Sequence, residues 1–238
     1  ISGWGVVGLQ AVIGVAMVPF LLEQLGKDGY GVIAMLLSII GFADVADLGL
    51  RQALNRELAE KVAKNDETEF RKLSSSALVL YLSMALIISA VVILLAPAIC
   101  SLFKVSEAYF DTMVIMLRTY MPLMILMSFV TPVFTAGVCS FMRYDVQNRV
   151  SLYVQLTTSF LLFICLSMIE VNPILVWCAI GFFSALFRLG LMVYFYRKLC
   201  YDGILSIKHV CYNSLKPLFK LGASMYILQL TRTLSERM

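Results

Sequence analysis

The stretch SALVLYLSMALIISAVVILLAPAICSLF, residues 76–103, carries no charged side chain and decides the fold class of this chain. A helix of about 20 mostly apolar residues, rising ~1.5 Å per residue, crosses the hydrocarbon core of a bilayer. A further run begins at Pro217 and reaches Met238. Other long apolar runs occupy residues 1–22, 30–50, 110–141, 148–169 and 173–196. The sequence therefore predicts an all-α integral membrane protein with six spans and the start of a seventh.

The composition supports a membrane protein and argues against several other classes. The chain is 61% hydrophobic and 14% charged, with a mean hydropathy of +0.88, whereas soluble domains average about 45–50% apolar and about 25% charged residues. His209 is the one histidine and the six cysteines show no paired spacing, so we expect no catalytic site, no metal site and no cofactor. No basic patch suggests nucleic acid; membrane lipids are the expected surroundings.

The basic residues predict the orientation of the spans. The gaps 51–72, 142–150 and 197–220 hold thirteen Lys and Arg residues, and the other three gaps hold only Lys27 and Lys104. Cytoplasmic loops of membrane proteins carry an excess of Lys and Arg. We therefore expect these three gaps and the N-terminus in the cytoplasm, in a multi-pass protein of the cell membrane, the inner membrane where there are two.

The chain is expected to divide into three parts. Residues 1–196 form a transmembrane unit of six helices, 197–216 a cytoplasmic connection with an interfacial helix, and 217–238 the start of a seventh span. Apolar residues recur every four positions in 51–64, which predicts an amphipathic helix that prolongs the second span. Asp66 followed by Glu69 resembles a capping box for the third span. Because Ile1 already lies in an apolar run, we expect both ends to be truncated.

Charged residues inside or beside spans are the candidate functional residues. A charge at the centre of a bilayer costs at least ~2.5–3.5 kcal/mol, so such groups usually face a cavity or a partner. Arg118 lies in the fourth span and Arg188 in the sixth, while Asp44, Asp47 and Arg51 lie near the cytoplasmic end of the second. Two simpler interpretations stay open: the arginines snorkel to headgroups, and Asp47 and Arg51 neutralise each other as an i,i+4 pair.

Polar and helix-bending residues interrupt several spans. A proline can kink a spanning helix, and neighbouring polar groups can satisfy the freed carbonyl. Ordinary packing through small and hydroxyl residues is the alternative. Together with the arginines inside spans, these polar and helix-bending residues favour a transporter with a water-accessible cavity. They are Gln10, Gly14 and Pro19 in the first span, Pro122, Thr131, Pro132, Thr135 and Ser140 in the fourth, and Gln155, Thr157, Thr158 and Ser159 in the fifth.

One short motif resembles a known family. It consists of Pro19-Phe20-Leu21, Leu25-Gly26, Gly29-Tyr30-Gly31, Asp47-Leu48-Gly49-Leu50 and Arg56. Its order and spacing resemble the opening of the polysaccharide-export and O-antigen flippases of the multidrug/oligosaccharidyl-lipid/polysaccharide exporter superfamily. The motif is confined to 19–56, and the pattern of spans extends the resemblance to the whole chain. The Leu-Gly to Tyr-Gly step would be the external turn, where glycine permits a positive φ.

The resemblance implies two six-helix lobes that rock between inward-open and outward-open states, with this chain as the N-terminal lobe. It implies flipping of a polyprenyl-pyrophosphate-linked oligosaccharide to the outer leaflet, without enzymatic chemistry; other membrane proteins of polysaccharide assembly are further candidate partners. Arg51, Arg118 and Arg188 would bind the pyrophosphate, because guanidinium groups pair with phosphate oxygens in a bidentate way. Asp44 and Asp47 would be coupling or structural acids.

Three other functions compete with this interpretation. A cation-coupled multidrug antiporter of the same superfamily often has an acid in the first span, which residues 1–22 lack. A membrane-embedded lipid-linked glycosyltransferase or polymerase often carries a large loop with acidic and His residues, whereas the external gaps here are small and the internal gaps lack a catalytic constellation. A purely structural or assembly protein gives no reason for arginines inside spans.

Overall fold

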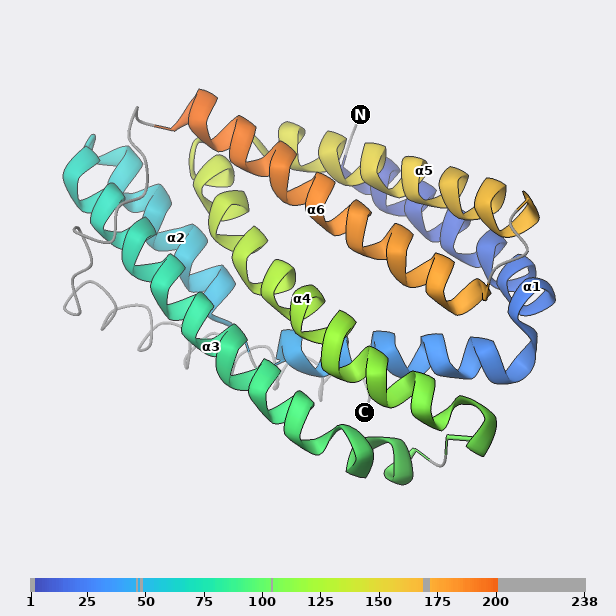
Figure 1. Ribbon diagram of the computed structural model, residues 1–238. Helices are drawn as coiled ribbons and strands as arrows, with labels where there is room; N and C mark the ends of the chain where they lie inside the picture. Colours follow the sequence, from blue (N-terminus) through green and yellow to red (C-terminus); the bar gives the residue numbers. More distant parts are fainter. Residues whose placement is uncertain (1–2, 46, 48, 104, 169–171, 201–238) are drawn as a thin grey trace, which may run out of the picture.

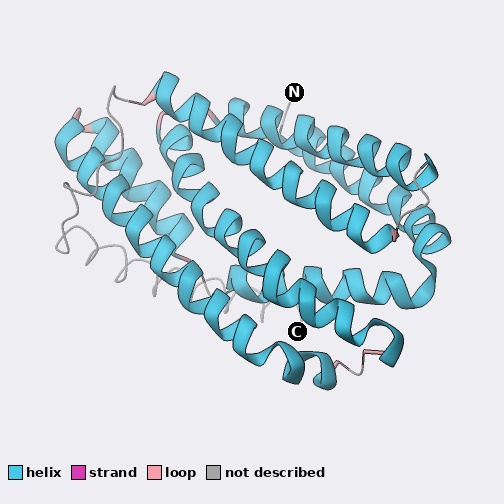
Figure 2. Cartoon of the chain, viewed as in Figure 1, coloured by secondary structure: helices cyan, strands magenta, loops and turns pink. Residues whose placement is uncertain are grey.

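The chain folds as a bundle of helices. A computed structural model describes residues 3–45, 47, 49–103, 105–168 and 172–200, and every regular element in this part is a helix (Figures 1 and 2). The elements are α1 (Gly3–Val45), α2 (Leu50–Ala63), α3 (Glu67–Leu102), α4 (Glu107–Ser140), α5 (Tyr144–Met168) and α6 (Pro173–Leu199).

Five of these helices, all except α2, are long and apolar enough to cross a membrane. The predicted all-α, multi-pass class is therefore confirmed. The six-helix lobe remains a prediction, and so do the three-part division and the seventh span, because residues 201–238 lie outside the described part of the chain, with Arg232 and most of 197–216 among them.

The first two predicted spans share α1, which is broken at Gly26. Gly26 has a φ of 69° and a ψ of 175° inside an otherwise helical segment, and the two arms of α1 meet there at a sharp bend (Figure 1). No atom lies within 4 Å of a Cβ built at Gly26, so it is the positive φ, and not crowding, that requires glycine. This residue belongs to the step that the sequence predicts to be a turn.

The amphipathic segment after the second span is a separate helix, which corrects the prediction that it prolongs that span. Gly49 has a φ of 74° and stands at the N-terminus of α2; a left-handed residue cannot continue a right-handed helix. Leu54 and Leu58 are fully buried, in a helix that packs against α3 and α4. The apolar face of α2 therefore covers protein.

One of the two hydrogen bonds of the predicted capping box at the start of α3 is confirmed, the one that Asp66 accepts. The Asp66 carboxylate accepts a hydrogen bond from the backbone N–H of Glu69 at 3.1 Å and one from the Thr68 hydroxyl at 2.9 Å. These donors lower the pKa of Asp66, the Glu69 N–H first and the Thr68 hydroxyl second. Just before it, Lys64 and Glu60 form an i,i+4 ion pair at 2.6 Å.

Helix α4 is the centre of the bundle. It contacts all five other helices, with α3 on one side and α6 and α5 on the other (Figure 1). Its Leu117, Met121, Ile125 and Val133 are fully buried. By contrast, large apolar side chains on the outer faces of α3 and α5, including Leu94 and Phe160, are exposed in the isolated chain, as expected for surfaces that contact lipid.

Candidate functional site

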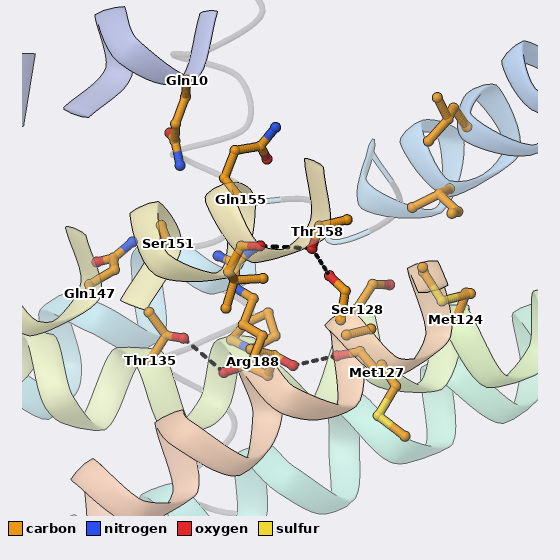
Figure 3. Close-up of a pocket in the computed structure, with 18 of the residues that line it drawn as sticks. Gln10, Met124, Met127, Ser128, Thr135, Gln147, Ser151, Gln155, Thr158 and Arg188 are labelled. Atoms are coloured by element: carbon orange, nitrogen blue, oxygen red, sulfur yellow. Dashed lines mark hydrogen bonds between the residues drawn. The ribbon is translucent and has the colours of Figure 1, made fainter. Parts of the chain in front are cut away.

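A polar cavity of about 560 Å³ lies between α4, α5 and α6, with α1 and α2 completing its wall (Figure 3). This volume falls within the roughly 300–1,000 Å³ of small-molecule sites. Most of the polar lining is neutral, and the lining contains two arginines and no acidic residue from the described part of the chain. The polar members are Gln10, Arg51, Asn55, Ser128, Thr131, Thr135, Gln147, Ser151, Gln155, Thr158, Ser184 and Arg188.

The polar lining follows from the helical period. On α5, Gln147, Ser151, Gln155 and Thr158 are spaced four, four and three residues apart, so they share one face of the helix. Figure 3 shows this row along the cavity. The same spacing places Ser128, Thr131 and Thr135 on the facing side of α4. Two helices thus turn polar stripes toward each other inside a largely apolar bundle.

Hydrogen bonds hold several of these side chains in place. Thr158 Oγ1 lies 2.7 Å from the Val154 carbonyl and 2.8 Å from Ser184 Oγ, which joins α5 to α6. Gln147 Oε1 accepts from the buried Cys139 thiol at 2.8 Å, which joins α5 to α4. The wall of the cavity is therefore organised by contacts between helices as well as within them.

On α4, the hydroxyl groups bond to their own helix around Pro132. Thr131 donates to the Met127 carbonyl at 2.7 Å, and Thr135 donates to the Thr131 carbonyl at 3.0 Å. Pro132 has no N–H, so the carbonyl of Ser128 lacks its helical donor. Both Ser128 and Pro132 line the cavity. The predicted combination of proline and hydroxyl residues thus occurs at the cavity.

Two of the three predicted arginines line the cavity. Arg188 reaches it from α6 and Arg51 from α2, although they are 137 positions apart in the sequence. Arg51 also interacts with Asp47: its backbone N–H donates to Asp47 Oδ2 at 3.2 Å, and its Nε lies 3.7 Å from the same oxygen. The Asp47 carboxylate is therefore placed both to cap the first turn of α2 and to orient the Arg51 guanidinium.

Asp47 is buried beside a second polar group. It is 7% exposed, and its other oxygen, Oδ1, has no hydrogen-bond partner among the described residues. Tyr81 of α3 is close enough to interact electrostatically with Asp47, although the geometry between them falls short of a hydrogen bond. The structural role and the coupling role of Asp47 both stay predictions.

The other predicted site residues lie elsewhere or are not described. Arg118 is exposed on α4 and is not part of the cavity lining, so its role in binding stays a prediction without support from this cavity. Asp44 lies in the last turn of α1, and its side chain is outside the described part of the chain.

Sequence reasoning missed several lining residues. Asn55 and Gln147 lie in segments predicted to be cytoplasmic, and Trp177 was not among the candidate residues; all three line the cavity. A signal was available for Gln147, because it stands four and eight residues before Ser151 and Gln155. No comparable spacing identifies Asn55, whose place depends on how α2 folds back on the bundle.

Comparison with known proteins agrees with the motif. The sequence profile of the family described as "Polysaccharide biosynthesis protein" matches residues 3–238. A Shigella flexneri protein named "Putative O-antigen transporter" is 30% identical over 83 residues, which cover 34% of this chain and 20% of that protein. No solved structure is significantly similar to the chain. Because the profile spans nearly every residue, this chain belongs to the family of polysaccharide biosynthesis proteins of the membrane.

Proposed function

We propose that this protein moves a polyprenyl-pyrophosphate-linked oligosaccharide from the cytoplasmic to the outer leaflet by alternating access, for the assembly of cell-surface polysaccharide. One observation carries the proposal: Arg51 and Arg188, from helices distant in sequence, line the same cavity with many neutral hydrogen-bonding groups and no described carboxylate. The family match and the name of the Shigella flexneri relative support a transport function in polysaccharide synthesis.

The chemistry of the two arginines suits a pyrophosphate. Each guanidinium presents N–H groups in a planar fork that matches two phosphate oxygens. A pyrophosphate offers two adjacent phosphoryl groups, so two arginines on different helices can bind it at the same time. The polyprenyl tail remains in the bilayer, and the protein shelters the polar head while it crosses. No bond of the substrate is made or broken.

The direction of transport follows from the predicted orientation. The thirteen-to-two distribution of basic residues supports a cytoplasmic location for the end of the bundle that carries α2 and the Tyr144 end of α5. Arg51 then belongs to the side from which the substrate is loaded. Arg188 lies deeper, about 11 residues inside α6 from Leu199, or roughly 16 Å along the helix.

The test is a leaflet assay of a labelled lipid-linked oligosaccharide in vesicles that contain the full-length protein. Arg188→Ala should abolish most transport at normal expression, and Arg188→Lys should retain part of it, because lysine keeps the charge and loses the fork. Arg118→Ala is the matched control, since it removes an arginine outside the cavity.

Normal transport by both Arg188→Ala and Arg51→Ala would contradict the proposal. A loss of transport in Arg118→Ala alone would move the binding site to the outer part of α4. Transport of a cationic drug by the wild-type protein, without transport of the lipid-linked oligosaccharide, would support the antiporter alternative.

A further inference from the structure

We propose that the polar face of α5, together with Gln10 of α1, forms a subsite that binds the first, uncharged sugar residues next to the pyrophosphate. This inference rests on the proposed function and deepens it, because it names the residues that distinguish one glycan from another. It starts from the excess of neutral polar groups in the cavity, which two arginines and a pyrophosphate do not explain.

The type of polar group points to hydroxyl-rich sugars. A sugar hydroxyl both donates and accepts hydrogen bonds, while an arginine only donates and a carboxylate only accepts. Amide side chains do both, and Gln10, Gln147 and Gln155 line the cavity. A second anionic group on the ligand would call for more cations than Arg51 and Arg188 supply. The lining therefore suits a neutral glycan joined to one charged group.

Of the three glutamines, one is hydrogen-bonded to another described residue, and the other two are available to bind a ligand. Gln147 accepts from Cys139 through Oε1, which leaves its amino group to donate. Gln10 and Gln155, in contrast, form no side-chain hydrogen bond with another described residue, and Figure 3 shows both beside the cavity on neighbouring helices. Amide groups in a partly buried site need partners, from water or from a ligand. A glycan hydroxyl can replace such a water.

The lining of the cavity also contains aromatic side chains. Trp177 and Tyr120 line it, and their rings lie edge to face with centroids 6.4 Å apart. The face of a pyranose ring exposes C–H groups, which pack well on an aromatic surface, while its rim carries the hydroxyls. A cavity lined by both amides and an indole matches both parts of a sugar.

The size of the cavity limits how many sugar residues of the glycan it can contact. About 560 Å³ is the volume of a site for a drug-sized molecule, which accommodates a pyrophosphate with one or two sugar residues. A longer glycan must extend beyond the enclosed part. Specificity should therefore depend on the sugars closest to the pyrophosphate and little on the rest of the chain.

Two binding probes test the inference with the full-length protein in detergent or nanodiscs. One is a polyprenyl pyrophosphate without sugar, and the other is the same lipid carrying a neutral hexose oligosaccharide. Gln155→Met and Gln10→Met keep the side-chain length and remove the amide. Gln52→Met is the matched control, because Gln52 is exposed on α2 and does not line the cavity.

Each cavity variant should weaken binding of the sugar-bearing probe by roughly 2- to 12-fold, the effect of one lost hydrogen bond, and leave the sugar-free probe unchanged. The control should bind both probes like wild type. If wild type binds both probes and neither cavity variant changes their ratio, the subsite is refuted and the proposed function stands. If wild type binds neither probe, the proposed function fails, and the subsite fails with it.

Discussion

The close contact between α4 and α6 gives a sharp test of the fold, through the substitution Gly137→Ala. A Cβ built at Gly137 lies 2.2 Å from Cε2 and 2.5 Å from Cδ2 of Tyr196. Cβ atoms in real structures essentially never approach another heavy atom more closely than 3.0 Å. The tyrosine ring, or the whole of α6, must therefore move by about 1 Å or more to accommodate one methyl group.

The surroundings of Tyr196 decide how costly this movement is. The side chain is 5% exposed, and its ring packs on Phe134 at 5.4 Å and on Phe70 at 6.5 Å between centroids. Overpacking of a core in this way costs about 1–3 kcal/mol, and a ring held from two sides places the cost near 3. Replacing glycine by alanine within a helix stabilises the folded protein by up to about 1 kcal/mol. The net destabilisation should be about 2 kcal/mol.

The measurement is equilibrium unfolding of the purified protein in detergent, with Gly190→Ala as the matched control. Gly190 lies in α6 with nothing within 4 Å of its built Cβ, so this variant should be as stable as wild type or slightly more so. A double variant, Gly137→Ala with Tyr196→Leu, should be less destabilised than the sum of its single variants, because the smaller side chain removes the clash. Equal stability of Gly137→Ala and Gly190→Ala would refute the α4–α6 contact.

Two further predictions concern acids. Because hydrogen bonds lower the pKa of Asp66 in the folded protein, its stabilising contribution is complete above the unfolded pKa near 3.9 and is lost as the pH falls through the folded pKa. The melting temperatures of wild type and Asp66→Ala should therefore differ at pH 7 and approach each other as the pH falls below the unfolded pKa. A difference that stays constant with pH would exclude the carboxylate as the cause. Asp47→Asn should insert normally and reduce transport about two- to fivefold, as for the loss of an ion pair worth roughly 0.4–1 kcal/mol, because the Arg51 side of the pair is 44% exposed. The amide keeps an acceptor for the Arg51 N–H and loses the charge. A severe, pH-dependent loss in the leaflet assay would show a coupling acid instead.

Much of the fold could be predicted because spans depend on length and hydropathy, which are local properties. The run 76–103 forms the later part of α3 and ends at its C-cap, Phe103, and the capping box at Asp66 marks the start of that helix. The break between α1 and α2 was harder to predict. The amphipathic pattern of α2 continues directly from the second span, and the left-handed conformation at Gly49 is a single-residue event that no periodicity reports.

The candidate site was predictable in its chemistry and only partly in its membership. Prolines with nearby hydroxyl groups indicated an interior cavity, and Thr131, Pro132, Thr135, Gln155 and Thr158 do line one. Asn55 of α2 was not predictable, because its place depends on tertiary packing of a segment that the sequence only shows to be amphipathic.

The two arginines inside spans show why depth alone was an insufficient guide. Arg118 and Arg188 were both predicted from their positions inside spans, which report only where a residue lies along the membrane normal. The helical period adds the second coordinate, about 100° per residue. Arg118 stands two residues before Tyr120, or about 200° around α4 from a lining residue, and so faces away from the cavity. Arg188 stands four residues after Ser184, within about 40° of a lining residue on α6, and does line it. Helix face, more than depth, therefore separates an arginine that can meet a polar substrate from one that can extend to the headgroups, and the contrast between Arg188→Ala and Arg118→Ala tests that distinction directly.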